Sequence, residues 1–491
     1  MNNGYLKAAA CLPQLFAGGI YQNTQSIKKL IMDLNGQGVD IAVFPEMCLY
    51  GASKTSIASQ NTLIKECEDA LLEIAQFTKN RGVLSVIGLP LRVEEKILNC
   101  AAAVGMGKVW GIIYKSNIKF NFDQITLGDY TIPFAQQAVM RTDTDLPINI
   151  AIIIGKDLNS IFNSSANIIL NPFSADLEQF DNYYEQIKSL SSSPPKAIVS
   201  VCGALNKTPY ADKSCLIAEC GKVLARKSNQ PIATAEIDIE RITGLRTLSD
   251  SCSTLSESSF IEIPIEETPR FAQKRRHPKM PYADEENFEH IYKRLAEILY
   301  ELTLSKKRLA VYHKCEHFWT LFSLLLDSSE LYPLKPANIT LLADGLIEKK
   351  DLIDISGFGI NIINLDLKSQ NIKNAQLIDY AEKNKCVILG GTDRTDYIRN
   401  KPCLGHFVNP LINLNKTAVY AMLRHRRKND SNWADILEKY RPSLDEIIID
   451  FFIYHYIDCG LSAQKTKHLA FDTFENAKKI EELWEEFIVT I

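Results

Sequence analysis

The chain has 491 residues, a length that predicts two or three domains. Hydrophobic residues make up 46% of it and charged residues 23%, which is typical of a soluble globular protein. The net charge of −4 gives no sign of a nucleic-acid partner or of binding to an anionic membrane surface.

Twelve cysteines are present, without a CxxC pair or a spacing typical of metal ligands. The N-terminal residues lack the charged and apolar segments of a secretory signal, and no apolar run is long enough to span a membrane. We therefore expect reduced thiols, a cytoplasmic location and no bound metal.

Short apolar strands alternate with amphipathic helices over the first half of the chain. Their order, with antiparallel pairs among the strands, predicts an α/β domain of two sheets faced by helices. Strands are predicted at 6–12, 40–44, 84–89, 101–104, 109–114, 150–154, 166–170, 197–201, 214–220 and 233–237, and helices at 20–34, 62–79 and 177–190.

A stretch rich in charge and proline follows and is predicted to be a linker, including the basic cluster 274–279. The predicted bounds are 1–264 for the first domain, 265–285 for the linker and 286–491 for the second domain. In the second domain, alternation of strands and helices predicts a parallel sheet covered by helices. The predicted elements are helices at 288–303 and 316–326, strands at 308–312, 338–342, 360–365 and 387–390, and a helical end at 432–491.

Three residues stand at or just beyond the ends of predicted strands: Glu46, Lys115 and Gly155. Their arrangement resembles the nitrilase superfamily, in which a Glu, a Lys and a Cys cleave amides or nitriles. Segments 165–172 and 213–225 also resemble that fold, which implies an αββα sandwich. Here Gly155 stands in place of the Cys.

The missing thiol predicts the loss of the first reaction, because covalent acyl transfer needs a nucleophile as well as a base and an oxyanion donor. Glu46 and Lys115 are then vestigial catalytic residues. We expect their side chains to converge beside Gly155, with an open space where the thiol would be.

The two domains together resemble the glutamine-dependent NAD synthetase family. Three segments of the second domain are similar to family motifs: 389–394, 409–420 and 441–446. The resemblance implies a nitrilase-like domain that releases ammonia from glutamine. It also implies a Rossmann-like synthetase domain that adenylates deamido-NAD with ATP, after which ammonia displaces AMP.

The second site also departs from the family. Where the family has a glycine-rich phosphate loop, the chain has His313–Phe318, without glycine and with the added charge of Glu316. The metal-binding acid aligns with Tyr397, beside Asp396, and a family Gly-Asp pair reads Gly405-His406. The nucleotide-binding residues that remain are Lys314, Gly391 and Thr392.

Two further groups of residues could form alternative sites, but each has a plainer explanation. Cys48 and Cys202 could supply a replacement thiol, but a buried cysteine more often acts as a small hydrophobic residue. His313, Cys315 and His317 could bind zinc, but no fourth ligand is evident, so an ordinary loop is favoured.

Three functions fit these residues. The first is an inactive, NAD synthetase-like structural or regulatory subunit without a cofactor, forming a homo-oligomer or pairing with an active NAD synthetase or a related protein. The second is a divergent glutamine- or ammonia-dependent NAD synthetase that uses ATP and Mg²⁺. The third is a sensor that binds glutamine or a nucleotide such as deamido-NAD without turnover.

Overall fold

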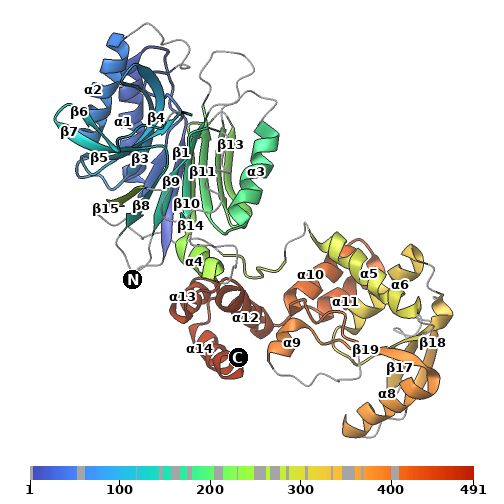
Figure 1. The fold of residues 1–491 in the computed structure, drawn as a ribbon. Helices are drawn as coiled ribbons and strands as arrows, with labels where there is room; N and C mark the ends of the chain where they lie inside the picture. The colour runs from blue at the N-terminus through green and yellow to red at the C-terminus, as the bar shows by residue number, and fades with distance from the viewer. Residues whose placement is uncertain are drawn as a thin grey trace. The chain divides into compact units, whose positions relative to one another are not determined.

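In the computed structural model the chain divides into two units, Met1–Arg275 with Cys459–Leu461, and Arg276–Asp458 with Ser462–Ile491 (Figure 1). The predicted limits at 264 and 286 stay predictions, and much of the predicted linker lies outside the described residues. The structure describes residues 4–51, 61–117, 119–142, 148–155, 166–173, 180–203, 214–228, 230–247, 261–265, 277–283, 287–304, 308–332, 335–344, 360–365, 370–399 and 408–491.

The first unit is built on two sheets. The eight-stranded sheet has the order β14-β1-β2-β3-β4-β5-β7-β6 and the seven-stranded sheet the order β13-β12-β11-β10-β9-β8-β15. The strands of the first sheet are β1 (Tyr5–Cys11), β2 (Ile41–Val43), β3 (Leu84–Val93), β4 (Lys96–Gly105), β5 (Lys108–Lys115), β6 (Gln124–Leu127), β7 (Tyr130–Ala135) and β14 (Ile232–Asp238). Those of the second are β8 (Ala138–Thr142), β9 (Asn149–Ile152), β10 (Ile168–Phe173), β11 (Ala197–Cys202), β12 (Ser214–Glu219), β13 (Lys222–Ser228) and β15 (Ile261–Ile265).

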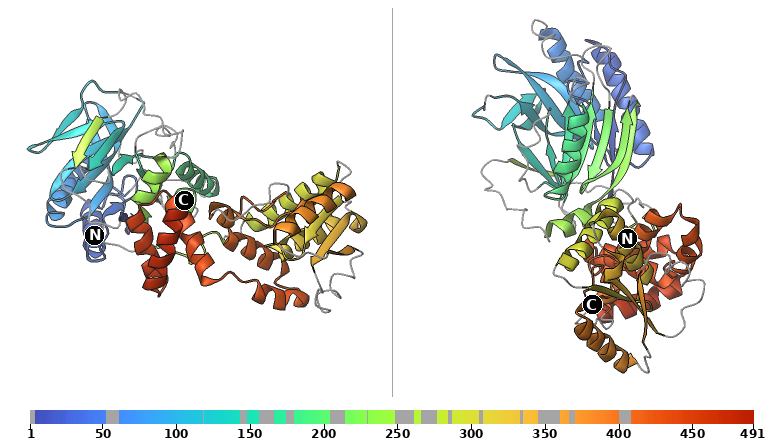
Figure 2. Two further views of the ribbon diagram at one scale, coloured as in Figure 1. Left: turned by 90° about the horizontal axis from the view of Figure 1, so that it is seen from below. Right: turned by 90° about the vertical axis from the view of Figure 1, so that its right-hand side faces the viewer.

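Three apolar layers hold this unit together, one between the two sheets and one on the outer face of each sheet. Alternate residues of the central strands, such as Val43 on β2 and Ile150 on β9, form a core between the two sheets. The opposite face of the eight-stranded sheet packs on α1 (Ile20–Gly36) and α2 (Asn61–Phe77). The opposite face of the seven-stranded sheet packs on α3 (Phe180–Ser192), as two further views agree (Figure 2). The predicted αββα layering is confirmed.

The second unit contains a four-stranded sheet of order β18-β17-β16-β19, formed by β16 (Arg308–Tyr312), β17 (Ile339–Asp344), β18 (Asn361–Leu365) and β19 (Cys386–Leu389). Every strand pair is parallel, as predicted. One face packs on α5 (Phe288–Leu304), α6 (Phe318–Leu331) and α10 (Lys416–Arg427), and the other on α8 (Gln370–Asn384). Further helices are α9 (Arg394–Ile398), α11 (Ala434–Lys439), α12 (Leu444–Phe452), α13 (Ala463–Thr473) and α14 (Ala477–Thr490).

Some elements differ from the prediction. Strands β6, β7, β8, β13 and β15, and helices α4 (Ile239–Thr247), α8, α9 and α10, were not predicted. Helices α4 and α8 lack a strong apolar face. Helix α6 begins at Phe318 rather than 316, because His317 has a left-handed φ of 57°. Among the described residues, no helix combines the length and apolar character needed to cross a bilayer.

Candidate functional site

Glu46, Lys115 and Gly155 come together at three strand ends of the first unit. Glu46 follows β2 and is buried, Lys115 is the last residue of β5, and Gly155 lies beyond β9. The Lys115 Nζ lies 3.9 Å from the Glu46 Oε1. The same Lys115 side chain lies against Gly155, so the predicted convergence is present. The catalytic ancestry of these residues stays a prediction.

The predicted open space beside Gly155 is wrong. A Cβ atom on Gly155 would lie 3.0 Å from Lys115 Cε and would overlap Lys115 Nζ. Gly155 also has a φ of +91°, which disfavours any side chain there. The Lys115 side chain therefore occupies the space that any side chain at position 155 would need.

Asn99 is a further residue of this site that the sequence analysis missed. It lies on β4 directly opposite Lys115 on β5, and its Nδ2 donates a hydrogen bond to Glu46 Oε1. Asn99 is 7% exposed, and its Oδ1 has no hydrogen-bond partner in the part of the chain that the structure describes. The predicted hairpin ended too early, at 101 and 114, to pair these two residues.

The turn at Gly155 is held by Asn171 on β10. The Asn171 Nδ2 donates to the carbonyl oxygens of Ile153, at 2.7 Å, and Gly155, at 2.9 Å. Its Oδ1 accepts from Ser200 Oγ at 2.8 Å and from the Tyr183 hydroxyl. Burial raises the pKa of Tyr183, so this hydroxyl stays a donor. The Asn171 amide nitrogen thus holds the turn at Gly155, while Ser200 and Tyr183 hold the Asn171 amide oxygen.

The alternative thiols do not have the environment of a nucleophile. Burial raises the pKa of Cys48 to about 12, and its thiol faces the carbonyl oxygen of Gly88 at 3.4 Å. Cys202 is fully buried in the apolar layer under α3. Reactive cysteines need a stabilised thiolate and access to substrate, so both thiols fit a packing role.

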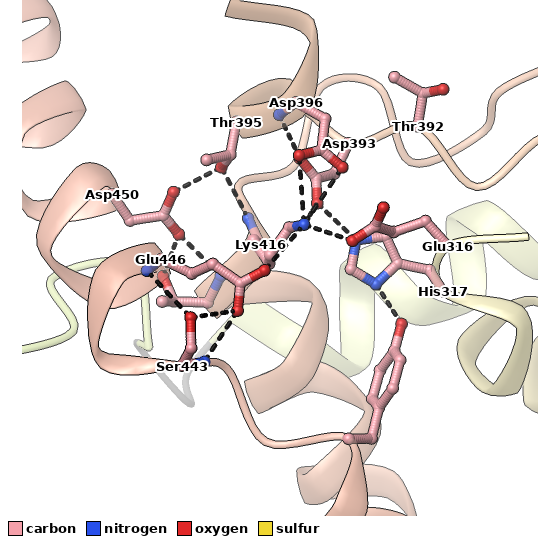
Figure 3. A network of polar contacts seen from close by, with 12 residues as sticks. Glu316, His317, Thr392, Asp393, Thr395, Asp396, Lys416, Ser443, Glu446 and Asp450 are labelled. Carbon is pink, nitrogen blue, oxygen red and sulfur yellow. Dashed lines mark hydrogen bonds and ion pairs between the residues drawn. The ribbon is translucent and has the colours of Figure 1, made fainter. Parts of the chain in front are cut away.

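In the second unit four carboxylates surround the ammonium of Lys416, the first residue of α10 (Figure 3). Its Nζ lies 2.5 Å from Glu316 Oε1, 3.1 Å from Asp396 Oδ2, 3.2 Å from Glu446 Oε1 and 3.8 Å from Asp393 Oδ2. Burial alone would lower the pKa of Lys416, but the carboxylates outweigh burial and raise it. The ammonium therefore stays charged.

A second set of contacts joins α9, α10 and α12 below this ammonium. The buried Asp450 carboxylate accepts hydrogen bonds from the Thr395 hydroxyl at 2.5 Å and from the Thr417 N–H at 2.7 Å and hydroxyl at 2.6 Å. Burial raises the pKa of Asp450 despite these donors. Each of the three segments that resemble family motifs, 389–394, 409–420 and 441–446, contributes one residue to the contacts of the Lys416 ammonium: Asp393, Lys416 itself and Glu446.

The loop that replaces the expected phosphate loop covers Gly391. A Cβ atom on Gly391 would collide with the backbone of Glu316, whose Cα lies 3.2 Å from it. The Thr392 N–H donates to Asn409 Oδ1 at 3.3 Å, and Lys314 is exposed on the loop. Of the predicted nucleotide-binding residues, Gly391 is therefore buried by the chain itself. Nucleotide binding by Lys314 and Thr392 stays a prediction.

His317 anchors the same loop. Its Nε2 lies 2.5 Å from Asp393 Oδ2, and its Nδ1 contacts the Tyr440 hydroxyl, so both ring nitrogens are engaged. Burial raises the pKa of the Cys315 thiol to about 12. Within the described ranges, no group of His, Cys, Asp or Glu is arranged to hold a metal ion. These contacts place Cys315 and His317 in a folded loop, and the predicted absence of a zinc site stays a prediction.

The structure places Tyr397, which aligns with the family's metal-binding acid, outside the polar centre around Lys416. Tyr397 is 59% exposed, whereas its neighbour Asp396 is buried and binds Lys416. An acid is therefore present at this centre, one residue before the position that the alignment gives to the metal-binding acid, and the loss of metal binding stays a prediction. Gly405 and His406 lie outside the described residues.

Together these features define an α/β protein with a nitrilase-like sandwich that has glycine at position 155, followed by a unit with a parallel sheet. No protein-family model matches the chain. It is 34% identical over 115 residues to the glutamine-dependent NAD(+) synthetase of Mycobacterium leprae, covering 23% of this chain and 17% of that protein. It is 24% identical over 281 residues to the Aquifex aeolicus enzyme, covering 52% of this chain and 48% of that protein.

The chain is a relative of the glutamine-dependent NAD synthetases. The matched part spans at most about half the length of these curated relatives. Among solved structures, the glutamine-dependent NAD(+) synthetase of Cytophaga hutchinsonii aligns with 99% of this chain and 92% of its own at 12% identity. The TM-score of this alignment is 0.42.

Proposed function

We propose that this chain is a catalytically inactive relative of the glutamine-dependent NAD synthetases that acts as a structural or regulatory subunit. The observation that carries the proposal is the Lys115 ammonium beside Gly155. Without a nucleophile, Glu46 has no thiol to deprotonate, and an amide carbonyl cannot be attacked. The neighbouring thiols are buried for packing and offer no substitute.

The second unit supports the same proposal. The backbone of Glu316 lies on Gly391, and the Glu316 carboxylate binds Lys416. A phosphate at this position would meet the carboxylates of Glu316, Asp393 and Asp396 rather than a ring of backbone N–H groups. We therefore expect the loop that carries Glu316, rather than a nucleotide, to fill this site. Its expected partner is a second copy or an active NAD synthetase.

A specific observation favours one alternative, a divergent synthetase that uses ATP and Mg²⁺. Asp396 keeps an acid at the polar centre, beside Gly391 and Thr392. If the loop 313–317 moved away, this acid could hold a metal ion with a nucleotide. The Asn99 Oδ1, which has no hydrogen-bond partner among the described residues, favours another alternative, in which the first site binds glutamine without cleaving it.

One reaction mixture tests the proposal. The purified full chain is incubated with deamido-NAD, ATP, Mg²⁺ and either glutamine or ammonia, and NAD is measured. We expect no NAD from either nitrogen source and no glutamate from glutamine above the level of a Glu46→Ala variant. NAD from ammonia alone would establish a working second unit, and NAD from glutamine would overturn the proposal for both units.

A pull-down with the tagged chain tests the subunit role. We expect it to recover a second copy of the chain or an active NAD synthetase. A thermal-shift measurement with glutamine, deamido-NAD and ATP then separates the subunit from the sensor, because a ligand that binds only the folded state raises its melting temperature.

A further inference from the structure

The feature that carries a further inference is a short segment of the second unit, His277–Ala283, which we call the strap. It lies against a stretch of π-helix, η8 (Ile453–Asp458). The Tyr282 ring of the strap meets the Tyr454 ring edge to face, with 5.3 Å between the ring centres. The Tyr282 hydroxyl donates a hydrogen bond to Asp458 Oδ2. The ring and the hydroxyl of one tyrosine thus both bind the strap to η8.

A second pair of rings holds the other end of the strap. The His277 ring meets the buried His455 ring edge to face, with 4.7 Å between the ring centres. The backbone of the strap forms a turn, in which the Ala283 N–H donates to the Met280 carbonyl oxygen at 3.1 Å. Side-chain contacts rather than a sheet ladder therefore hold the strap in place. Segments held in this way open more readily than the core of a fold.

The Asp458 carboxylate that accepts from Tyr282 is also bound by Arg394, the first residue of α9. The Arg394 guanidinium donates to both oxygens of Asp458, at 2.6 and 2.9 Å. The side chains of Arg394 and Asp458 are 28% and 27% exposed, so water reaches the pair only in part. Burial raises the pKa of Tyr282, so its hydroxyl keeps its proton and stays a donor.

Arg394 also joins the starts of two helices. Its backbone N–H donates to the Leu414 carbonyl oxygen at 2.9 Å, and its guanidinium donates to Asn415 Oδ1 at 3.3 Å. Asn415 is the N-cap residue of α10 and is buried. Arg394 therefore fixes the start of α9 against the start of α10, and its own position depends on Asp458.

The residue before Arg394 anchors the loop 313–317. Asp393 is the N-cap of α9, and its Oδ2 lies 2.5 Å from His317 Nε2 (Figure 3). His317 holds the loop that covers Gly391. A displacement of Arg394 therefore reaches the loop through one peptide bond and one side-chain contact.

We propose that the strap is a releasable element and that Arg394 transmits its position to the loop 313–317. With the strap in place, Tyr282 shields the ion pair of Arg394 and Asp458, and the pair holds the start of α9. When the strap is displaced, water reaches the pair and weakens it, so the loop over Gly391 loosens. A partner that displaces the strap thus acts on the loop without touching it, whether or not the protein makes NAD.

Hydrogen exchange of the full chain, without any substrate, tests the proposal. Tyr282→Ala removes the ring and the hydroxyl that hold the strap. We expect the amides of His313 and Cys315, which are hydrogen-bonded in the native loop, to exchange about threefold faster or more. Tyr300→Ala is the matched control, because Tyr300 stacks on Tyr332 at the far ends of α5 and α6, and it should leave these amides unchanged.

A double variant tests the part played by Arg394. Arg394→Gln removes the two-point contact with Asp458 and should itself speed exchange in the loop. Adding Tyr282→Ala to Arg394→Gln should then have no further effect, because the path from the strap to the loop is already broken. Effects that multiply in the double variant would show that Arg394 does not transmit the position of the strap.

Tyr282→Phe decides the matter if Tyr282→Ala does not fold. It keeps the ring beside Tyr454 and removes only the hydroxyl, so it should speed exchange of the same amides by a smaller factor. The proposal fails if the folded Tyr282 variants leave exchange in the loop unchanged, or if Tyr300→Ala changes it equally. Because the NAD assay is a separate measurement, the failure of this proposal and the failure of the proposed function are distinguishable.

Discussion

The Lys115 ammonium occupies the position that a side chain on Gly155 would need. A cysteine at position 155 would require the Lys115 side chain to move. The lysine can keep its present position because residue 155 is a glycine. A side chain at position 155 and the present position of the Lys115 side chain are therefore incompatible.

Restoring the thiol alone should not restore amidase chemistry. In Gly155→Cys the new side chain meets Lys115 and an unfavourable φ of +91°. We expect no glutamate from glutamine and a loss of about 1–3 kcal/mol in the free energy of unfolding. Gly155→Ala is the matched control, with the same strain and no thiol. Glutamate release by the cysteine variant above the Glu46→Ala background would contradict this.

Asn171 should be the main support of the Gly155 turn. Asn171→Ala leaves the carbonyl oxygens of Ile153 and Gly155 without their donor in a buried site. We expect a loss of about 3–5 kcal/mol in urea unfolding, from several hydrogen bonds lost at once. Ser200→Ala removes one contact to Asn171 and should cost about 1 kcal/mol. Equal effects of the two substitutions would mean that Asn171 does not organise the turn.

Gly391 should tolerate no side chain. Gly391→Ala drives a Cβ atom into the backbone of Glu316, so we expect it to lose about 1–3 kcal/mol and to loosen the loop 313–317. Hydrogen exchange of that loop and urea unfolding measure both effects. Gly36→Ala is the control. Gly36 is the last residue of α1, and a Cβ atom there would meet no atom within 4 Å. This variant should gain about 0.5–1 kcal/mol in the free energy of unfolding. If Gly391→Ala left the free energy of unfolding unchanged, the loop would have to move aside freely.

The Glu446 carboxylate should make the free energy of unfolding depend on pH in the acidic range. Burial acts to raise the pKa of Glu446, but hydrogen bonds from Ser443 and the charge of Lys416 outweigh it, and the pKa falls below its usual 4.5. Its stabilisation is thus present above pH 4.5 and is lost as the pH falls through the folded pKa. Glu446→Gln should cost on the order of 1 kcal/mol at pH 7 and almost nothing near pH 3.

Asp445→Asn is the control for this pH dependence. Asp445 lies in the same first turn of α12 but binds Lys479, at 2.8 Å, instead of Lys416. Urea unfolding at pH 3, 5 and 7 gives the comparison. A pH-independent difference between the native chain and Glu446→Gln would show that the Glu446 charge does not contribute.

The sequence was most informative where a single strand or helix decides the outcome. The apolar period of 20–34 and 62–79 predicted α1 and α2, and strand ends predicted that Glu46, Lys115 and Gly155 meet. It could not predict that the Lys115 side chain folds over Gly155, because that depends on the Gly155 turn and on Asn171 beneath it. The pairing of Asn99 with Lys115 also needs the register of a hairpin that was predicted too short.

The second site was harder to predict for a physical reason. The segments 389–394, 409–420 and 441–446 were identified separately, but their meeting point is a long-range arrangement of three helix starts. Nothing in the local pattern links Glu316 to Lys416, which lie 100 residues apart. The exposed side of α9 likewise decides between Asp396 and Tyr397, and the sequence alone does not orient a helix of five residues.

Strand β15 has a practical consequence for dissecting the protein. Residues Ile261–Ile265 pair in parallel with β8, at the edge of the seven-stranded sheet. A fragment that stops before Ile261 would leave the N–H and C=O groups of β8 open to pairing with another chain. Such a fragment should aggregate. Work on the sandwich in isolation should therefore begin from a chain that extends through Ile265.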